Sequence, residues 1–114
     1  WLTPDATMEE VLTELSEKRV GGVNIVSDRC SRKLVGIVSD GDLKRLLKKR
    51  EAFFEMTAGE VMTRDPVKVH ENDKALYALE LMENRPSQIS ILPVVNDKGR
   101  AVGMLRVHDL MQIF

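Results

Sequence analysis

The chain has 114 residues, 43% of them hydrophobic and 31% charged, with a formal net charge of −1. This composition is typical of a globular protein with a modest core, and the balanced charge argues against nucleic acid and acidic membranes as partners. No apolar run approaches the roughly 20 residues that a membrane-spanning helix needs. The single cysteine excludes an internal disulfide and no secretory signal is evident, so we expect a cytoplasmic protein.

The first half of the chain predicts two helices around a pair of strands. Thr7 and Glu10 have the spacing of a capping box, which favours a helix start at this point. The glycine pair at Gly21 ends that helix, and Cys30 lies in a polar loop, where we expect a free surface thiol. The predicted elements are a helix to about residue 19, strands at 23–26 and 34–38 around the loop 27–33, and a helix over about 41–50.

The second half predicts the same order of elements after a short connecting segment. Thr57 and Glu60 form a second capping-box signature, and Asp65-Pro66 breaks the turn of helix that it opens. The remaining predicted elements are an extended segment at 67–69, a helix at about 73–84, a strand at 89–95, a tight turn at 96–99, a strand at 101–106 and a helix from about 108.

An internal repeat relates the two halves. The segment 34–47, LVGIVSDGDLKRLL, returns as the segment 101–114, AVGMLRVHDLMQIF, at an offset of 67 (101 − 34) without a gap. Upstream of the hairpin turn the offset is 69, which pairs Asp28 with Asp97 (97 − 28). One copy alone leaves an apolar sheet face uncovered. We therefore predict an α/β (α+β) fold in which two small sheets, each flanked by helices, pack as a pseudo-twofold pair with a cleft between them.

Polar residues stand at the junction between strand and helix in each copy. The first junction has Ser39 and the second has Arg106. A helix start presents unpaired N–H groups that attract phosphate, Ser39 can donate a hydroxyl there, and Asp42 can accept from a ribose hydroxyl. Alternatively, Ser39 or Asp40 caps the helix and Asp42 only favours its first turn. The spacing alone favours capping, whereas the duplication of the pattern favours a ligand site.

The duplicated pattern G-h-h-S-x-x-D, in which h is apolar, resembles the signature of a tandem pair of cystathionine-β-synthase (CBS) domains, over essentially the whole chain. The resemblance implies a first CBS motif at 1–54 without its lead-in strand, a linker and lead-in at 55–66, and a second motif at 67–114 with a truncated last helix. Because no lead-in precedes the first motif, we expect the chain to be part of a longer polypeptide.

The resemblance also implies a nucleotide site. Its phosphate and ribose positions match Ser39 and Asp42, and the strand beside the base matches Val23, Asn24 and Ile25 in the first motif. In the second motif the matching positions are Leu92, Pro93, Arg106 and Asp109. Arg106 stands where the pattern has Ser or Thr, so we expect one good site, although an arginine also suits phosphate.

Two segments resemble a particular branch of this family. The segments 86–95, PSQISILPVV, and 105–110, LRVHDL, are similar to the C-terminal region of bacterial D-arabinose-5-phosphate isomerases. Those enzymes join a sugar-isomerase (SIS) domain to a CBS pair and supply the precursor of the lipopolysaccharide sugar 3-deoxy-D-manno-octulosonate. The resemblance implies that this chain is the regulatory region of such an enzyme, without the SIS domain. It implies an adenine or cytidine nucleotide, or a CMP-sugar, as effector, and no required cofactor.

Other functions lack the residues that they need. No Ser/His/Asp set is present, and His70 and His108 are isolated, so we expect neither catalysis nor a metal site. The basic helix end at 44–50 lacks interleaved aromatic residues for nucleic acid and is expected to face solvent, with contact to a catalytic domain as the alternative. Regulation of another enzyme or a transporter stays open, as does a structural module. In a structural module, exposed apolar helix faces would form a homodimer through Leu43, Leu46, Leu47, Leu110, Ile113 and Phe114.

Overall fold

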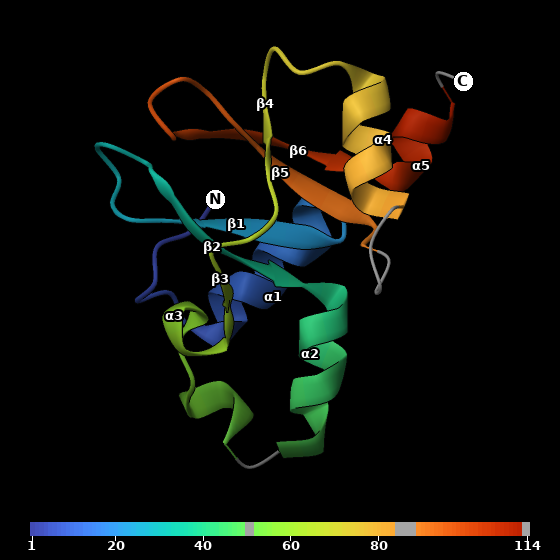
Figure 1. The fold of residues 1–114 in the computed structure, drawn as a ribbon. Helices are drawn as coiled ribbons and strands as arrows, with labels where there is room; N and C mark the ends of the chain where they lie inside the picture. The colour runs from blue at the N-terminus through green and yellow to red at the C-terminus, as the bar shows by residue number, and fades with distance from the viewer. Residues whose placement is uncertain (50–51, 84–88, 113–114) are drawn as a thin grey trace.

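The computed structural model describes residues 1–49, 52–83 and 89–112, and it has two small sheets with helices beside them (Figure 1). The strand order is β1-β2-β3 in one sheet and β4-β5-β6 in the other, which confirms the predicted fold class. The elements are α1 (Met8–Lys18), β1 (Gly22–Val26), β2 (Leu34–Ser39), α2 (Asp40–Leu46), 3-10 turns (Leu47–Lys49 and Phe53–Glu55), α3 (Ala58–Val61), β3 (Thr63–Arg64), β4 (Val69–His70), α4 (Ala75–Glu83), β5 (Ile91–Val95), β6 (Ala101–Arg106) and α5 (Val107–Met111).

Both predicted capping boxes begin helices. The Thr7 hydroxyl accepts from the Glu10 N–H at 3.2 Å, and the Glu10 carboxylate accepts from the Thr7 N–H at 3.3 Å. At the start of α3, Thr57 donates from its N–H and its hydroxyl to Glu60. No helix in the described ranges is both long and apolar enough to cross a membrane. Predicted helix positions that lie outside the described residues are Arg50, Asn84, Ile113 and Phe114.

The registers of the two hairpins confirm the internal repeat. Gly22 pairs with Ser39 in the first hairpin, and Ile91 pairs with Arg106 in the second. These pairs are related by the predicted offsets of 69 (91 − 22) and 67 (106 − 39). Each hairpin also has a register shift at the equivalent position, so the two copies share even their irregularity.

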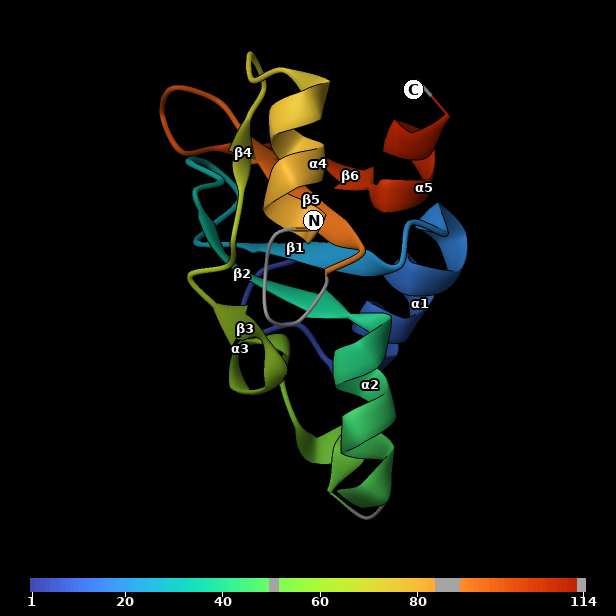
Figure 2. The same ribbon diagram turned by 45° about the vertical axis from the view of Figure 1, so that its right-hand side comes forward.

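The two hairpin turns meet at a pseudo-twofold axis. The Leu34 N–H donates to the Gly99 carbonyl at 3.0 Å, and the Ala101 N–H donates to the Arg32 carbonyl at 2.9 Å. The two bonds are equivalent under the repeat, because the donors Leu34 and Ala101 are 67 residues apart (101 − 34), as are the acceptors Arg32 and Gly99 (99 − 32). Arg32 and Gly99 share a left-handed backbone, with φ of 51° and 74°. Figures 1 and 2 both show the two turns at the same end of the molecule.

The segment that connects the motifs adds a strand to the first sheet. β3 lies within the predicted linker and pairs antiparallel with β2. The approach is close, because a Cβ atom at Gly36 would lie 2.4 Å from the Met62 Sδ. Val69, the last residue of the predicted extended segment 67–69, begins β4, which pairs in parallel with β5. Leu2 makes the equivalent parallel bridge to β1 in the first half. As the chain passes from one motif to the other, it thus adds β3 to the first sheet and then β4 to the second.

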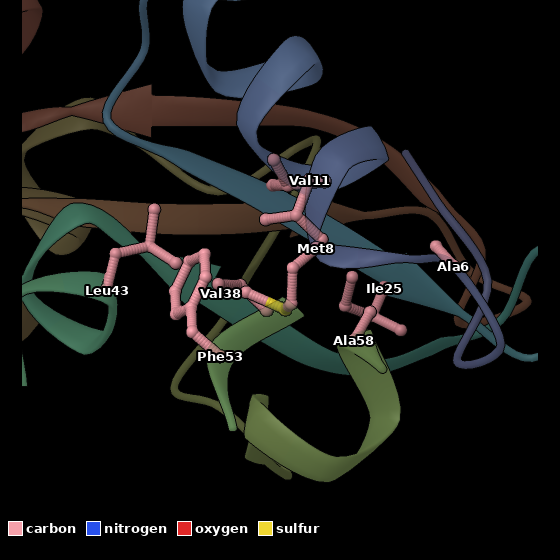
Figure 3. Packing of buried hydrophobic residues seen from close by; sticks show 9 residues of the cluster. Ala6, Met8, Val11, Ile25, Val38, Leu43, Phe53 and Ala58 are labelled. Atoms are coloured by element: carbon pink, nitrogen blue, oxygen red, sulfur yellow. The ribbon is translucent and has the colours of Figure 1, made fainter. Parts of the chain in front are cut away.

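Each half has an apolar core, and the helices face it. Figure 3 shows Leu43 of α2 turned toward Phe53 in the first core. The expectation that Leu43 and Leu110 lie on exposed faces is therefore wrong: they are 8% and 2% exposed, and Leu110 belongs to the second core. Leu46 also packs against the first core, whereas Leu47 is 54% exposed. An amphipathic helix here covers its own sheet.

Candidate ligand-binding cleft

A cleft of about 520 Å³ lies between the two halves of the molecule. One wall comes from β2 and α2, and the other comes from the connecting segment and the region of β5. Three residues predicted from the sequence, Ser39, Asp42 and Pro93, line it together. The other lining residues are Gly21, Ile37, Asp40, Gly41, Arg45, Thr63, Pro66, Val67, Ile89, Ser90 and Ile91.

Ser39 and Asp42 form a capping box at the start of α2. The Ser39 Oγ accepts from the Asp42 N–H at 3.2 Å, and the Asp42 Oδ2 accepts from the Ser39 N–H and hydroxyl at 2.9 and 3.0 Å. The other carboxylate oxygen pairs with Arg45. A carboxylate offers about four acceptor positions, so about one remains for a ligand. The capping interpretation is confirmed, and the role of Asp42 toward a ribose hydroxyl stays a prediction.

The second junction is closed by its own side chains. Arg106 donates from Nε and Nη2 to the two carboxylate oxygens of Asp109, at 2.8 and 2.7 Å. The hydrogen bonds from Arg106 hold the pKa of the Asp109 carboxyl below its usual range, and the pKa of Arg106 is raised in turn. A further bond runs from Arg106 Nη1 to the Arg19 carbonyl at 3.3 Å. Neither Arg106 nor Asp109 lines the cleft, so the structure does not bring the two predicted ribose carboxylates together.

Four further predicted site residues lie within the strands. Val23 and Ile25 of β1 are buried in the first core, and Leu92 of β5 is buried in the second. Asn24 is 8% exposed and faces the other half, where its Nδ2 donates to the Gly103 carbonyl at 2.9 Å. None of the four lines the cleft. Contact between a base and the backbone of these strands stays a prediction.

The wall formed by the connecting segment was missed from the sequence. Thr63, Pro66 and Val67 line the cleft because β3 pairs with β2 and the chain then crosses to the second half. In the sequence, the Asp65-Pro66 pair indicates only the end of a turn of helix. Two other residues that line the cleft, Gly21 and Ser90, are equivalent in the repeat at the offset of 69 (90 − 21), so the repeat relates them to each other. Each carbonyl accepts from the first N–H of the following helix, at 3.0 and 2.8 Å.

The fold and the cleft define the class of protein, a tandem α/β repeat whose two halves share one pocket. The chain belongs to the CBS domain family, whose family model matches residues 1–49 and 58–114. The resemblance seen in the sequence is thereby confirmed.

Named relatives and solved structures are similar to this chain over most of its length. Arabinose 5-phosphate isomerase KdsD of Francisella tularensis is 30% identical over 110 residues, which is 96% of this chain and 32% of the relative. The chain thus spans about a third of that relative. The CBS domain protein PAE2072 from Pyrobaculum aerophilum, complexed with AMP, has a TM-score of 0.81 at 29% identity. The match covers 95% of this chain and 81% of the PAE2072 chain. The CBS domain pair of protein MJ0100, in complex with 5′-methylthioadenosine and S-adenosyl-L-methionine, has a TM-score of 0.83 at 27% identity, with 99% and 85% covered.

Proposed function

We propose that the chain is the regulatory CBS pair of an arabinose-5-phosphate isomerase and that it binds a nucleotide or a nucleotide sugar. The relative named as this isomerase supports the parent, and the neighbours that hold AMP or S-adenosyl-L-methionine support the ligand class. The observation that carries the proposal is the cleft in which Ser39 and Asp42 face the connecting segment and β5. The proposal includes a cytoplasmic parent that serves 3-deoxy-D-manno-octulosonate synthesis and carries an SIS domain.

The walls of the cleft suit a ligand with a flat base and a hydroxylated sugar. Ile37, Ile91 and Pro93 provide apolar surface, and Asp42 provides the remaining hydrogen-bond acceptor. Within this proposal the chain regulates and the SIS domain catalyses. The described residues contain no cluster of three potential metal ligands, and the proposed site uses none.

Regulation would act through the relative orientation of the two motifs. A ligand in the cleft touches α2 of the first motif and residues 89–91 of the second. It stabilises whichever orientation it binds more tightly, and the shift equals the difference between its two binding free energies. An effector that binds both orientations equally would leave the enzyme unchanged.

The proposal is tested by calorimetric titration of the 114-residue chain with AMP, CMP and the cytidylylated octulosonate. We expect Asp42→Asn to weaken the ligand that binds by about 1.5–3 kcal/mol, because a hydrogen bond to a charged group is lost. Asp109→Asn is the matched control, since it occupies the equivalent place in the repeat and lies outside the cleft. Equal affinity for the wild type and Asp42→Asn, with both folded, would contradict the site.

An exposed apolar surface favours dimerisation as a second function. Leu47 and Phe54 are 54% and 63% exposed and border a hollow of about 710 Å³ beside α2. Burial of such side chains between two copies would favour a homodimer. A purely structural module would form dimers that Leu47→Lys with Phe54→Lys disrupts, as seen by light scattering, and it would bind none of the three nucleotides.

A further inference from the structure

A second cavity, of about 490 Å³, lies beside the hairpin turns and shares no lining residue with the cleft. We call it the hairpin cavity. Its polar walls are Asn24, Arg32, Asn96 and Arg100, and Trp1 forms an aromatic side. The family resemblance implies a nucleotide-site role for Asn24, but Asn24 borders a different cavity from Ser39 and Asp42.

Positive charge is unbalanced in the hairpin cavity. Arg32 and Arg100 line it, no carboxylate does, and neither arginine forms a salt bridge within the described ranges. The acidic residues of the two turns have other partners. Asp28 accepts from backbone amides of its own turn, and Asp97 lies 2.5 Å from the His70 Nε2. Two guanidinium groups on one concave wall attract an anion.

Two residues that line this cavity also carry buried polar atoms that lack a hydrogen-bond partner. Among the described residues, the buried side-chain atoms without a hydrogen-bond partner are Asn24 Oδ1 and Arg32 Nε. Both residues line this cavity, and the two atoms lie just beneath its wall, since each exposes less than 1 Å². Asn24 is more than nine-tenths buried, and its Nδ2 already donates to the Gly103 carbonyl, so Oδ1 is left as an acceptor. Native proteins leave few such atoms, and a bound water, ion or ligand is a frequent explanation.

Several contacts restrain the residues around the hairpin cavity before any ligand arrives. The Arg32 carbonyl is fixed by the bond between the two turns. The Asn96 Oδ1 accepts from the Lys98 and Arg100 N–H groups, both at 3.0 Å, which leaves the Asn96 Nδ2 to donate. The Trp1 ring lies 5.3 Å from the Arg32 Cζ, a distance suited to a cation–π contact. The Asn96 amide and the Arg32 guanidinium are restrained in this way and lose little freedom when they bind.

We propose that the hairpin cavity binds a small phosphate ester that also carries a hydroxyl or N–H donor. The phosphoryl oxygens accept from Arg32 and Arg100, because planar guanidinium groups match the geometry of phosphate. The ligand hydroxyl or N–H supplies the missing donor to the Asn24 Oδ1. Sugar phosphates and nucleotides share this chemistry. The site is independent of the proposed function, since none of its residues lines the cleft.

Trp1 reports directly on this cavity, because it is the only tryptophan of the chain. We would titrate the 114-residue chain with ribose 5-phosphate, AMP and inorganic phosphate, with ribose as the uncharged control, and follow Trp1 fluorescence. We expect a saturable change with a phosphate ester and none with ribose. Tighter binding of ribose 5-phosphate would identify the natural ligand as a sugar phosphate, and tighter binding of AMP would identify it as a nucleotide.

Variants separate the two sites. Arg32→Gln and Arg100→Gln are each expected to weaken the ester at least tenfold. Arg29→Gln is the matched control, since Arg29 is exposed in the same turn and lies outside the cavity. Asp42→Asn should leave the Trp1 response unchanged, and that result would stand even if no nucleotide binds in the cleft.

Three results would overturn the proposal. One is the absence of any Trp1 response to both esters in folded wild-type protein. Another is an unchanged affinity in the double variant Arg32→Gln with Arg100→Gln. The third is a response that disappears in Asp42→Asn, because the ligand would then lie in the cleft and not in the hairpin cavity.

Discussion

Gly36 is the position at which one added methyl group should do most damage. Gly36→Ala places a Cβ atom 2.4 Å from the Met62 Sδ and 3.0 Å from the Thr63 carbonyl oxygen. The Met62 side chain can turn aside, but the carbonyl belongs to β3, which is paired with β2, so the strand must shift. Overpacking of this kind costs about 1–3 kcal/mol, which lowers Tm by at least about 4 °C in a domain of this size.

Gly103 gives the matched control for this substitution. It is equivalent to Gly36 at the offset of 67 (103 − 36), and a Cβ atom there meets nothing within 4 Å. We expect Gly103→Ala to leave stability within about 1 kcal/mol of the wild type. Urea and thermal unfolding of the three proteins measure the difference, and AMP titration adds a second readout because Thr63 lines the cleft. Equal unfolding midpoints for Gly36→Ala and Gly103→Ala would refute the reasoning.

Two other predictions concern the second motif. The lowered pKa of Asp109 means that its pair with Arg106 stabilises the fold above the unfolded carboxyl pKa of about 3.9, and that this stability is lost as pH falls through the lower folded pKa. Asp109→Asn should therefore flatten the dependence of Tm on pH below about pH 5 and leave the slope above it unchanged, as scanning calorimetry would show. Leu110→Ala should cost about 2–5 kcal/mol in urea unfolding because Leu110 is buried, whereas Leu47→Ala should change it by no more than about 0.5 kcal/mol. Similar losses in the two leucine variants would contradict the assignment of Leu110 to the core.

The sheets were predictable from the sequence to the extent that their contacts are local. Hairpin partners lie close along the chain, and the repeat offsets predict that the two hairpins are equivalent, which the pairs at Ser39 and Arg106 confirm. β3 has two residues and pairs outside its own half, so it shows no periodicity and no local partner. Leu43 was misplaced because an apolar helix stripe has the same pattern whether it covers its own sheet or a partner.

The cleft was predictable where its chemistry is local. Ser39 and Asp42 are three residues apart, and the capping box that joins them follows from that spacing. Asp109 has the same spacing from Arg106, but the two side chains form an ion pair instead of a capping box. A serine hydroxyl can satisfy a backbone N–H, whereas the longer guanidinium reaches the carboxylate and occupies both of its oxygens. The sequence shows the arginine, but its target depends on side-chain conformation.

A symmetric backbone with two different junctions has a consequence for the proposed regulation. The pseudo-twofold axis supplies two equivalent helix starts, and the bond between Arg106 and Asp109 closes one of them. At the open junction Asp42 retains about one acceptor position, so a ribose hydroxyl adds to the capping box without displacing Ser39. In the proposed complex the start of α2 would therefore stay intact. The proposed signal would then come from movement of one motif against the other, across a cleft whose walls belong to both.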